Sequence, residues 1–151
     1  METLTLSDYR LLAELRYQLR RFLKFSEDAA RKAGIEPHQH QLLLAIRGLP
    51  ENEQPRIGVL AERLQIQPHS AVELANRLSK AGCVRRTRDS EDRREVLLSL
   101  TLKGERLLRQ LSLDHRAELR TAGPMLMTAL RQIDAGKARR EKPSKSGRVR
   151  T

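Results

Sequence analysis

Apolar residues recur every three or four positions along the first part of the chain, the spacing that places them on one face of a helix. This stripe lies between Ser7, a residue type that caps helix N-termini, and Gly34. Its members are Leu11, Leu12, Leu15, Leu19, Phe22 and Leu23. We therefore predict a long amphipathic helix that begins at Ser7 and ends near Gly34.

Three shorter helices are predicted over 37–48, 57–64 and 68–82. The first and third begin with a proline, which suits the first helical turn, and reach a glycine, which accepts the left-handed conformation that ends helices. Residues 65–67 are expected to form the turn between the second and third. The third helix is apolar on one side only, and its other side consists almost entirely of hydrogen-bonding side chains.

Beyond Gly82 the pattern changes to that of a β-hairpin. Residues 84–88 and 95–100 have strand composition, and a charged turn joins them. Thr101 can cap a further helix, which we expect Gly123 and Pro124 to break or kink. A last short helix is then predicted over 125–133.

Composition narrows the fold class and the compartment. Of 151 residues, 38% are hydrophobic and only 3% aromatic, which favours a helical core of Leu, Ile, Val and Ala over a β-sandwich. No apolar run approaches the length of a membrane span, and no secretory signal pattern begins the chain. The one cysteine, Cys83, cannot form an internal disulfide, and it serves either core packing or thiol sensing. We expect a cytoplasmic protein without a membrane partner.

The chain is strongly basic, with 30 Lys and Arg against 19 Asp and Glu, a net charge of +11. Residues 135–151 hold seven of the basic residues, one acidic residue and no apolar periodicity, so we predict a disordered basic tail there. The other 23 basic and 18 acidic residues still leave about +5 on the body. This balance favours a polyanionic partner, most often nucleic acid, over a merely soluble cationic protein.

Residues 57–100 have the order of a winged helix-turn-helix, because two short helices joined by a tight turn precede a charged hairpin. A polar helix face can read the major groove, and an arginine at a hairpin tip can reach phosphates or a minor groove. Asp92 is expected to orient Arg94 for that role, or alternatively to form only a surface ion pair with it. The predicted DNA-binding residues are Pro68, His69, Ser70, Glu73, Asn76 and Arg77 on the helix, and Arg86, Arg88, Asp92, Arg93 and Arg94 on the hairpin.

Three segments resemble the MarR-type regulators, and the resemblance extends to about Asp134. The most specific segment is the hairpin, where Asp-x-Arg is followed by Leu-Thr-x-x-Gly. The matching residues are Ile57-Gly58-Val59-Leu60-Ala61-Glu62-Arg63-Leu64, Asn76-Arg77-Leu78 with Gly82, and Asp89-Ser90-Glu91-Asp92-Arg93-Arg94 followed by Leu98-Ser99-Leu100-Thr101 and Gly104. The resemblance implies an obligate homodimer, held by its N- and C-terminal helices, that binds a palindromic operator and often releases it on binding a small molecule.

Some positions depart from the family's usual pattern. Gln65 stands in the turn where glycine is common, and Glu73 stands where arginine or threonine is more frequent. Glu73 can accept a hydrogen bond from cytosine N4, or it can be a surface charge or a brake on nonspecific binding. The resemblance places the small-molecule site near Arg16, His38 and His40.

We therefore predict a mainly α fold: a winged helix-turn-helix with a two-stranded β-wing, plus N- and C-terminal dimerisation helices. The expected divisions are 1–34 for the first dimerisation helix, 35–100 for the DNA-binding domain, 101–134 for the C-terminal dimerisation helices and 135–151 for the tail. The expected function is transcriptional regulation as a repressor homodimer on double-stranded DNA, with release by a small aromatic or amphipathic effector.

Two alternatives stay open, a ligand-independent or architectural DNA-binding protein of the same fold, and a basic RNA-binding protein. The scarcity of aromatic residues counts against RNA binding, because modules that read RNA bases do so by stacking. Catalysis is not indicated, since the sequence has no recognisable acid and base pair, nucleophile motif or phosphate-binding loop. No histidine pair has metal-ligand spacing, so we expect neither enzyme activity, nor a metal, nor a cofactor.

Overall fold

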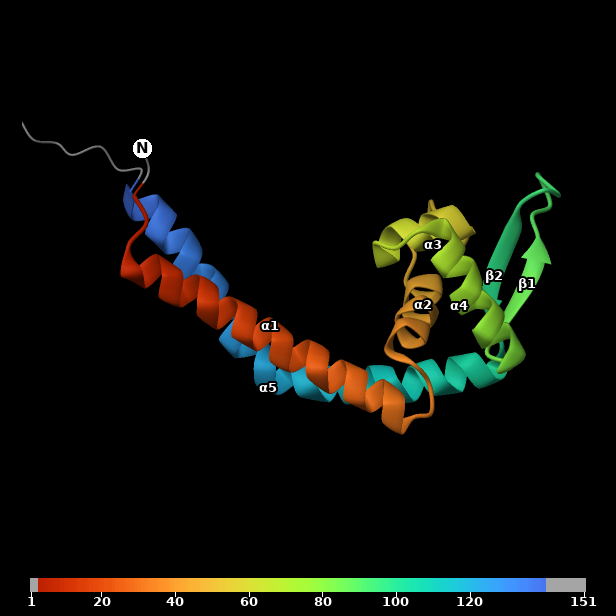
Figure 1. Cartoon of the computed structure of the whole chain (residues 1–151), viewed down its shortest axis with the longest axis horizontal. Coiled ribbons are helices and arrows are strands. Elements are labelled where there is room, and N and C mark those ends of the chain that lie inside the picture. The colour runs from red at the N-terminus through yellow and green to blue at the C-terminus, as the bar shows by residue number, and fades with distance from the viewer. Residues whose placement is uncertain (1–2, 141–151) are drawn as a thin grey trace, which may run out of the picture. The chain divides into compact units, whose positions relative to one another are not determined.

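A computed structural model of the chain describes the backbone of residues 3–140 and the side-chain surroundings of residues 3–135. The elements follow in the order α1 (Leu6–Lys32), α2 (Pro37–Arg47), α3 (Ile57–Leu64), α4 (Pro68–Lys80), β1 (Val84–Arg88), β2 (Val96–Leu100) and α5 (Leu102–Arg140) (Figure 1). The two strands form an antiparallel hairpin in which Val84 faces Leu100 and Arg88 faces Val96. The predicted fold class, mainly α with a two-stranded wing, is confirmed.

The chain divides into two compact units, each containing part of α1 and part of α5. The central unit is Phe25–Arg116, and the terminal unit consists of the described residues of Met1–Lys24 and Ala117–Thr151. The central unit begins within α1, ten residues before the boundary predicted at 34, because the last turns of α1 contribute to its core through Ala30.

The core of the central unit is made of aliphatic side chains from every one of its elements. Its fully buried members include Leu42 and Leu43 of α2, Leu60 of α3, Leu78 of α4, Leu98 of β2 and Leu111 of α5. Cys83 is also buried in this core, which fits the packing role that the sequence left open for it. Because α2, α3, α4 and the hairpin share one core, they hold the outer face of α4 and the hairpin in one fixed arrangement.

The turn between α3 and α4 lies at 65–67, as predicted, and it explains the unusual Gln65. This residue adopts the left-handed conformation, with φ 56° and ψ 43°, in which glycine is normally preferred. Its side-chain amide donates a hydrogen bond of 2.8 Å to the carbonyl oxygen of Glu62, which offsets part of the backbone strain. Pro68 then occupies the first turn of α4, also as predicted.

The junction between the hairpin and α5 gives a structural reason for the Leu-Thr-x-x-Gly motif. The Thr101 hydroxyl donates to the carbonyl oxygen of Gly82 at 2.6 Å and accepts from the backbone N–H of Gly104 at 3.1 Å. A Cβ atom at Gly104 would collide with the carbonyl oxygen of Cys83. The motif therefore closes the core where the backbone of α5 passes against the turn between α4 and β1.

The start of α1 differs from the prediction. Thr5 caps the helix, because the Asp8 carboxylate accepts hydrogen bonds from both the backbone N–H and the hydroxyl of Thr5, each at 2.7 Å. Ser7 lies inside the first turn and is not the cap. A Thr-x-x-Asp pair satisfies the exposed N–H groups better than a single serine, so the helix begins earlier.

The predicted separate helix over 125–133 is wrong, because α5 runs through Gly123 and Pro124 without interruption, from Leu102 to Arg140. Proline fixes φ near the helical value and removes one N–H donor, a cost that a helix of 39 residues can absorb. The carbonyl oxygen of Pro124 accepts a hydrogen bond of 2.9 Å from the Thr128 hydroxyl. Although α1 and α5 are long, neither they nor any other described helix is apolar enough to cross a membrane.

The predicted basic tail begins later than expected. Residues 135–140 belong to α5, so the assignment of this part to a disordered tail is wrong. Alanine, lysine and arginine dominate these six positions, and all three are good helix formers, which explains the extension. The rest of the predicted tail, 141–151, lies outside the described residues.

Candidate nucleic-acid interface

Helix α4 has an apolar inner face and a polar outer face. Ala71, Ala75 and Leu78 are buried in the central unit. The residues predicted to contact DNA lie on the other side, where Ser70 is partly exposed and Pro68, His69, Glu73, Asn76 and Arg77 are exposed. The structure thus brings all six predicted helix residues to one accessible surface.

Two polar contacts already order this outer face. Glu73 pairs with Arg77 one turn later, with 2.5 Å between Oε1 and the guanidinium NH2, and both side chains are more than half exposed. Asn76 accepts a hydrogen bond from Arg86 of β1. Glu73 therefore orients Arg77, and Arg86 lies against the end of α4 instead of projecting freely from the hairpin.

Val72 belongs to the same surface, although sequence reasoning did not include it. Its side chain is 39% exposed, an unusual fraction for a branched apolar residue within a helix. It was omitted because the predicted contacts were limited to hydrogen-bonding side chains, and valine has no side-chain polar atom. On a helix that faces DNA, an exposed valine suits contact with the methyl group of thymine.

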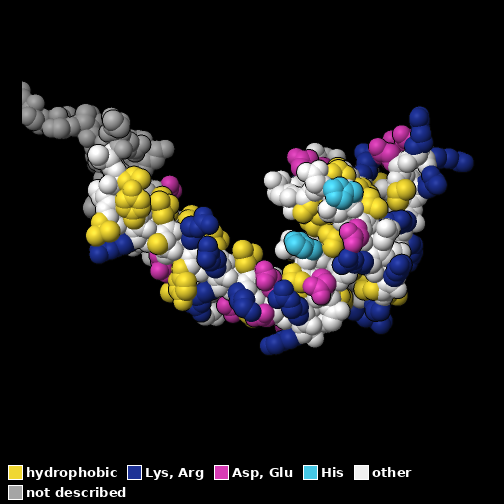
Figure 2. Space-filling model, viewed as in Figure 1, with side chains coloured by type: hydrophobic (Ala, Val, Ile, Leu, Met, Phe, Trp, Pro, Cys, Tyr) yellow, Lys and Arg dark blue, Asp and Glu magenta, His cyan; other side chains and the backbone are white. Residues whose placement is uncertain are grey.

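At the hairpin tip, Asp92, Arg93 and Arg94 are exposed, and Arg88 lies beside them at the end of β1. Basic side chains gather at this end of the molecule, with acidic ones beside them (Figure 2). Arg94 is 95% exposed, its Nε lies 3.7 Å from Oδ1 of Asp92, and the same oxygen accepts the backbone N–H of Arg94 at 3.0 Å. The Arg88 guanidinium donates a hydrogen bond of 2.7 Å to the carbonyl oxygen of Arg93, so Arg88 stabilises the turn.

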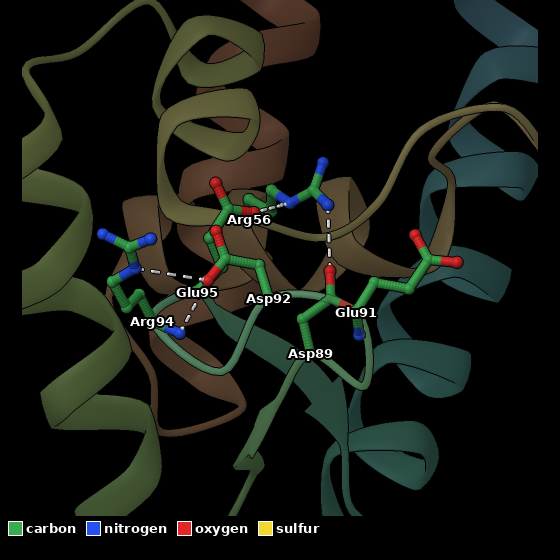
Figure 3. Close-up of polar contacts among 6 residues, drawn as sticks. All are labelled: Arg56, Asp89, Glu91, Asp92, Arg94 and Glu95. Atoms are coloured by element: carbon green, nitrogen blue, oxygen red, sulfur yellow. Dashed lines mark hydrogen bonds and ion pairs between the residues drawn. The ribbon is translucent and has the colours of Figure 1, made fainter.

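The base of the tip contains a second ionic cluster that the sequence did not reveal (Figure 3). Arg56, the residue before α3, donates from NH2 to Oδ2 of Asp89 at 2.9 Å, and its Nε pairs with Oε2 of Glu95. Backbone pairing places Arg56 beside β2, since it bridges Leu97. No local motif pointed to these contacts, because Arg56 and Asp89 are 33 positions apart.

The electrostatics of this cluster favour the charged form of both partners. Asp89 is only 7% exposed, and its Oδ1 accepts the backbone N–H of Glu91 at 2.9 Å. That hydrogen bond and the one from Arg56 hold the pKa of Asp89 below its usual range. The bond to Asp89, aided by the charge of Glu95, raises the pKa of Arg56. Both directions favour the ion pair between Arg56 and Asp89.

The three residues predicted to line a small-molecule site are in different surroundings. His38 lies at a pocket of about 230 Å³ beside α4, lined by His38, Ile66, Ser70, Glu73, Leu74 and Arg77. Arg16 lies on the part of α1 that belongs to the terminal unit. The pocket therefore combines one predicted ligand residue with three residues of the predicted DNA-reading surface.

His40 is buried instead of lining that pocket. It is 3% exposed, and its ring lies 4.8 Å from the ring of His115, centre to centre. Burial, and then the neighbouring His115, lower the pKa of His40 to about 4, so its ring is neutral at neutral pH. The His115 ring nitrogens lie 2.5 Å from the Leu111 carbonyl oxygen and 2.6 Å from the Ser26 hydroxyl. Within the described residues, no group of three or more His, Cys, Asp or Glu is placed to hold a metal ion.

Comparisons with known proteins agree with this architecture. Residues 33–95 match the MarR family profile. The chain is 30% identical over 78 residues to the HTH-type transcriptional repressor MdtR of Bacillus subtilis (strain 168); the alignment covers 52% of this chain and 48% of MdtR, so the chain spans about half the length of that curated relative.

Two solved structures share the fold. Sco3205 of Streptomyces coelicolor, a MarR family transcriptional regulator in complex with DNA, matches with a TM-score of 0.67 and 22% identity, over 99% of this chain and 97% of that one. CouR of Rhodococcus jostii RHA1, bound to p-coumaroyl-CoA, matches with a TM-score of 0.65 and 22% identity, over 88% and 92%.

Proposed function

We propose that the chain is a MarR-type transcriptional regulator, as the family match over residues 33–95 indicates, and that it binds double-stranded DNA as a homodimer. The name of MdtR, a repressor, and the DNA complex of Sco3205 support this proposal by analogy. We favour repression at a palindromic operator, because a dimer with two-fold symmetry presents two identical reading surfaces.

One observation carries the proposal: the exposed polar face of α4 and the arginine-rich hairpin tip belong to the same rigid core. The major groove is wide enough for a helix, and a hairpin beside that helix can reach the neighbouring minor groove or phosphates. The net charge of +11 adds counterion release to any contact with DNA. In this arrangement α4 supplies base readout, and Arg93 and Arg94 supply contacts at the flank.

Dimerisation is proposed from the apolar surface of the terminal unit. Its large exposed apolar side chains are Leu4, Leu6, Tyr9, Leu12, Tyr17, Leu19, Leu23, Leu119, Met125, Met127 and Leu130. Monomeric proteins rarely expose so much apolar surface together, and a second copy of the chain would cover it. Two recognition helices then stand about 34 Å apart, one turn of DNA, when both half-sites are bound.

An effector site is proposed at the pocket beside α4. CouR was solved with p-coumaroyl-CoA, an amphipathic ligand, and the pocket here offers His38 and Arg77 together with Ile66 and Leu74. A small amphipathic molecule in this pocket would compete with DNA for Ser70, Glu73 and Arg77 directly. Binding of this kind involves no chemical conversion, so we propose a binding protein and not an enzyme.

The function is tested by titrating the full chain with a labelled duplex from the region upstream of its own gene. We expect tight binding that persists with excess RNA and random duplex as competitors and weakens with rising salt. Binding that RNA removes as efficiently as unlabelled duplex would contradict the proposal and favour the RNA-binding alternative.

A further inference from the structure

One side chain from outside the wing, that of Arg56, contacts both ends of the wing tip. The tip loop, residues 90–94, lies between Asp89 and Glu95. Asp89 donates its backbone N–H to the carbonyl oxygen of Glu95 at 3.0 Å, which closes the loop. Arg56 binds the carboxylates of both closing residues (Figure 3).

The geometry needs an arginine in particular. The guanidinium presents Nε and NH2 in a fixed plane, and here each of these atoms meets a different carboxylate. The backbone of Arg56 is itself fixed, because it forms an antiparallel β-bridge with Leu97 of β2. The carbonyl oxygen of Pro55 also accepts a hydrogen bond of 3.0 Å from the backbone N–H of Leu98. Because its backbone is held in place, the Arg56 side chain keeps the carboxylates of Asp89 and Glu95 at a fixed separation.

The contacts continue from this clamp to the exposed arginine. Glu95 donates its backbone N–H to the carbonyl oxygen of Asp92 at 3.0 Å, and Asp92 in turn binds Arg94. The path therefore runs from Arg56 to Glu95, then to Asp92 and finally to Arg94, and each step is a hydrogen bond or an ion pair. From this arrangement we infer that Arg56 is a positioning residue for DNA binding: it fixes the direction in which the wing tip presents Arg94, without touching DNA itself.

Arg56 also balances charge at a place where DNA would be close. Without it, Asp89 and Glu95 would be two facing carboxylates beside a polyanion, and Asp89 would be buried without its cation. Loss of Arg56 therefore both frees the tip to move and adds local repulsion toward phosphates. This inference rests on the proposed function, since it assigns a role within DNA binding by the wing.

The test compares Arg56→Met with Arg47→Met in the full chain, using a duplex selected by the wild-type protein from a random pool. Arg47 is the control, since it forms an ion pair between elements, with Glu105 at 3.4 Å, and does not contact the wing tip. We expect Arg56→Met to weaken binding about 10-fold, the loss expected for one charge-assisted contact, and Arg47→Met to have little effect. Arg56→Lys should restore only part of the affinity, because an ammonium cannot bind two carboxylates in one plane.

Footprinting separates positioning from general damage. Minor-groove protection by the wing should disappear in Arg56→Met, and major-groove protection by α4 should persist. Adding Arg94→Ala to the variant Arg56→Met/Asp89→Asn/Glu95→Gln, which has no unpaired carboxylate, should weaken binding much less than Arg94→Ala does in the wild type, since Arg56 acts through the tip. The same triple variant replaces Arg56→Met in the footprinting test if the single variant unfolds, because it leaves no buried carboxylate without a cation.

Three results would overturn the inference. These are unchanged affinity and footprint in Arg56→Met, a full minor-groove footprint in the triple variant, or an equal loss of affinity when Arg94→Ala is added to the triple variant and to the wild type. The second result would mean that Arg56 only neutralises charge. A wild-type protein that selects no duplex would instead overturn the proposed function, and the inference with it.

Discussion

The central and terminal units carry the same helical spacing of apolar residues and use it in opposite ways. In the central unit, Leu42 of α2, Leu60 of α3, Leu78 of α4 and Leu98 of β2 are each no more than 1% exposed. In the terminal unit, Leu12, Leu19 and Leu23 of α1 remain 44% to 51% exposed. The side chains classed as buried among the described residues of this unit are Gln18, Ala122 and Ala129, which are polar or small.

The difference shows what an apolar stripe does and does not specify. The spacing predicts a helix and tells which face needs covering, but it does not tell what covers that face. In the central unit the chain covers its own stripes, so this unit can hold a reading surface rigidly. In the terminal unit the stripe is left open, which is why we assign it to a second copy of the chain. Substitutions that affect one unit and leave the other unchanged test this difference.

The largest effect is expected from charging the open stripe. The variant Leu12→Glu/Leu19→Glu/Leu23→Glu should raise the dimer dissociation constant by more than about 1000-fold, because each leucine contributes roughly 2 kcal/mol of apolar burial per copy. The thermal unfolding of the central unit should be unchanged. Leu44→Glu is the matched control, since Leu44 of α2 is equally exposed but belongs to the central unit. Sedimentation velocity decides, and a dimer that survives the triple substitution would refute the assignment.

The next effect should be confined to the central unit. Gly104→Ala should destabilise it by about 3 kcal/mol, because the new methyl group meets the Cys83 carbonyl oxygen and the backbone cannot yield cheaply. Gly58→Ala is the control, since a Cβ there meets nothing within 4 Å and alanine favours helix α3. Urea denaturation of both variants measures the difference. Equal stability would show that the close approach is not a constraint on the fold.

A smaller, pH-dependent effect should come from His40. The pKa of His40 is about 4 in the folded chain, below the ordinary value of 6.5, so between these two pH values His40 is protonated in the unfolded chain and neutral in the folded chain. Stability should therefore fall as the pH drops from 6.5 toward 4, by about 1.4 kcal/mol for each pH unit at most, and level off below that window. His40→Phe should remove this dependence, whereas the exposed His38→Phe should retain it. Denaturation curves at pH 7 and pH 5 provide the comparison, and an identical pH dependence in His40→Phe would contradict it.

The smallest effect concerns the turn between α3 and α4. Gln65→Gly should stabilise the central unit by roughly 0.5 kcal/mol, since glycine accepts the left-handed conformation but gives up the hydrogen bond to Glu62. Gln67→Gly is the control, because Gln67 has an ordinary extended backbone. Differential scanning calorimetry should show a small increase in melting temperature for the first variant only. A decrease for Gln65→Gly would mean that the side-chain hydrogen bond outweighs the strain.

Much of the fold was predictable because its signals are local. The prolines at 37 and 68, the turn at 65–67 and the strand composition around 84–88 each fixed an element to within a residue or two. Pro124 misled the prediction, since a proline inside a helix costs about 3 kcal/mol but need not end a helix that is long enough to continue on both sides of it. The cap at Thr5 was missed because Ser7 is an equally good capping type by sequence alone.

The candidate site was predictable only in part, and for the same reason. Helical spacing placed Glu73, Asn76 and Arg77 on one face, and the structure brings them together there. The cluster around Arg56 joins segments 33 positions apart, and the contact between His40 and His115 joins α2 to α5. Such contacts exist only after the core has formed, so no local pattern could reveal them.

The central claim is that the hairpin tip of this chain enters DNA through an arginine that its own carboxylate orients. Titration of the upstream duplex with Arg94→Ala, Asp92→Ala and the double variant, at one salt concentration, tests it most directly. We predict that Arg94→Ala binds at least about 10-fold more weakly, that Asp92→Ala also binds more weakly, and that the double variant is no worse than Arg94→Ala. Tighter binding by Asp92→Ala, or near-normal binding by Arg94→Ala, would contradict the account.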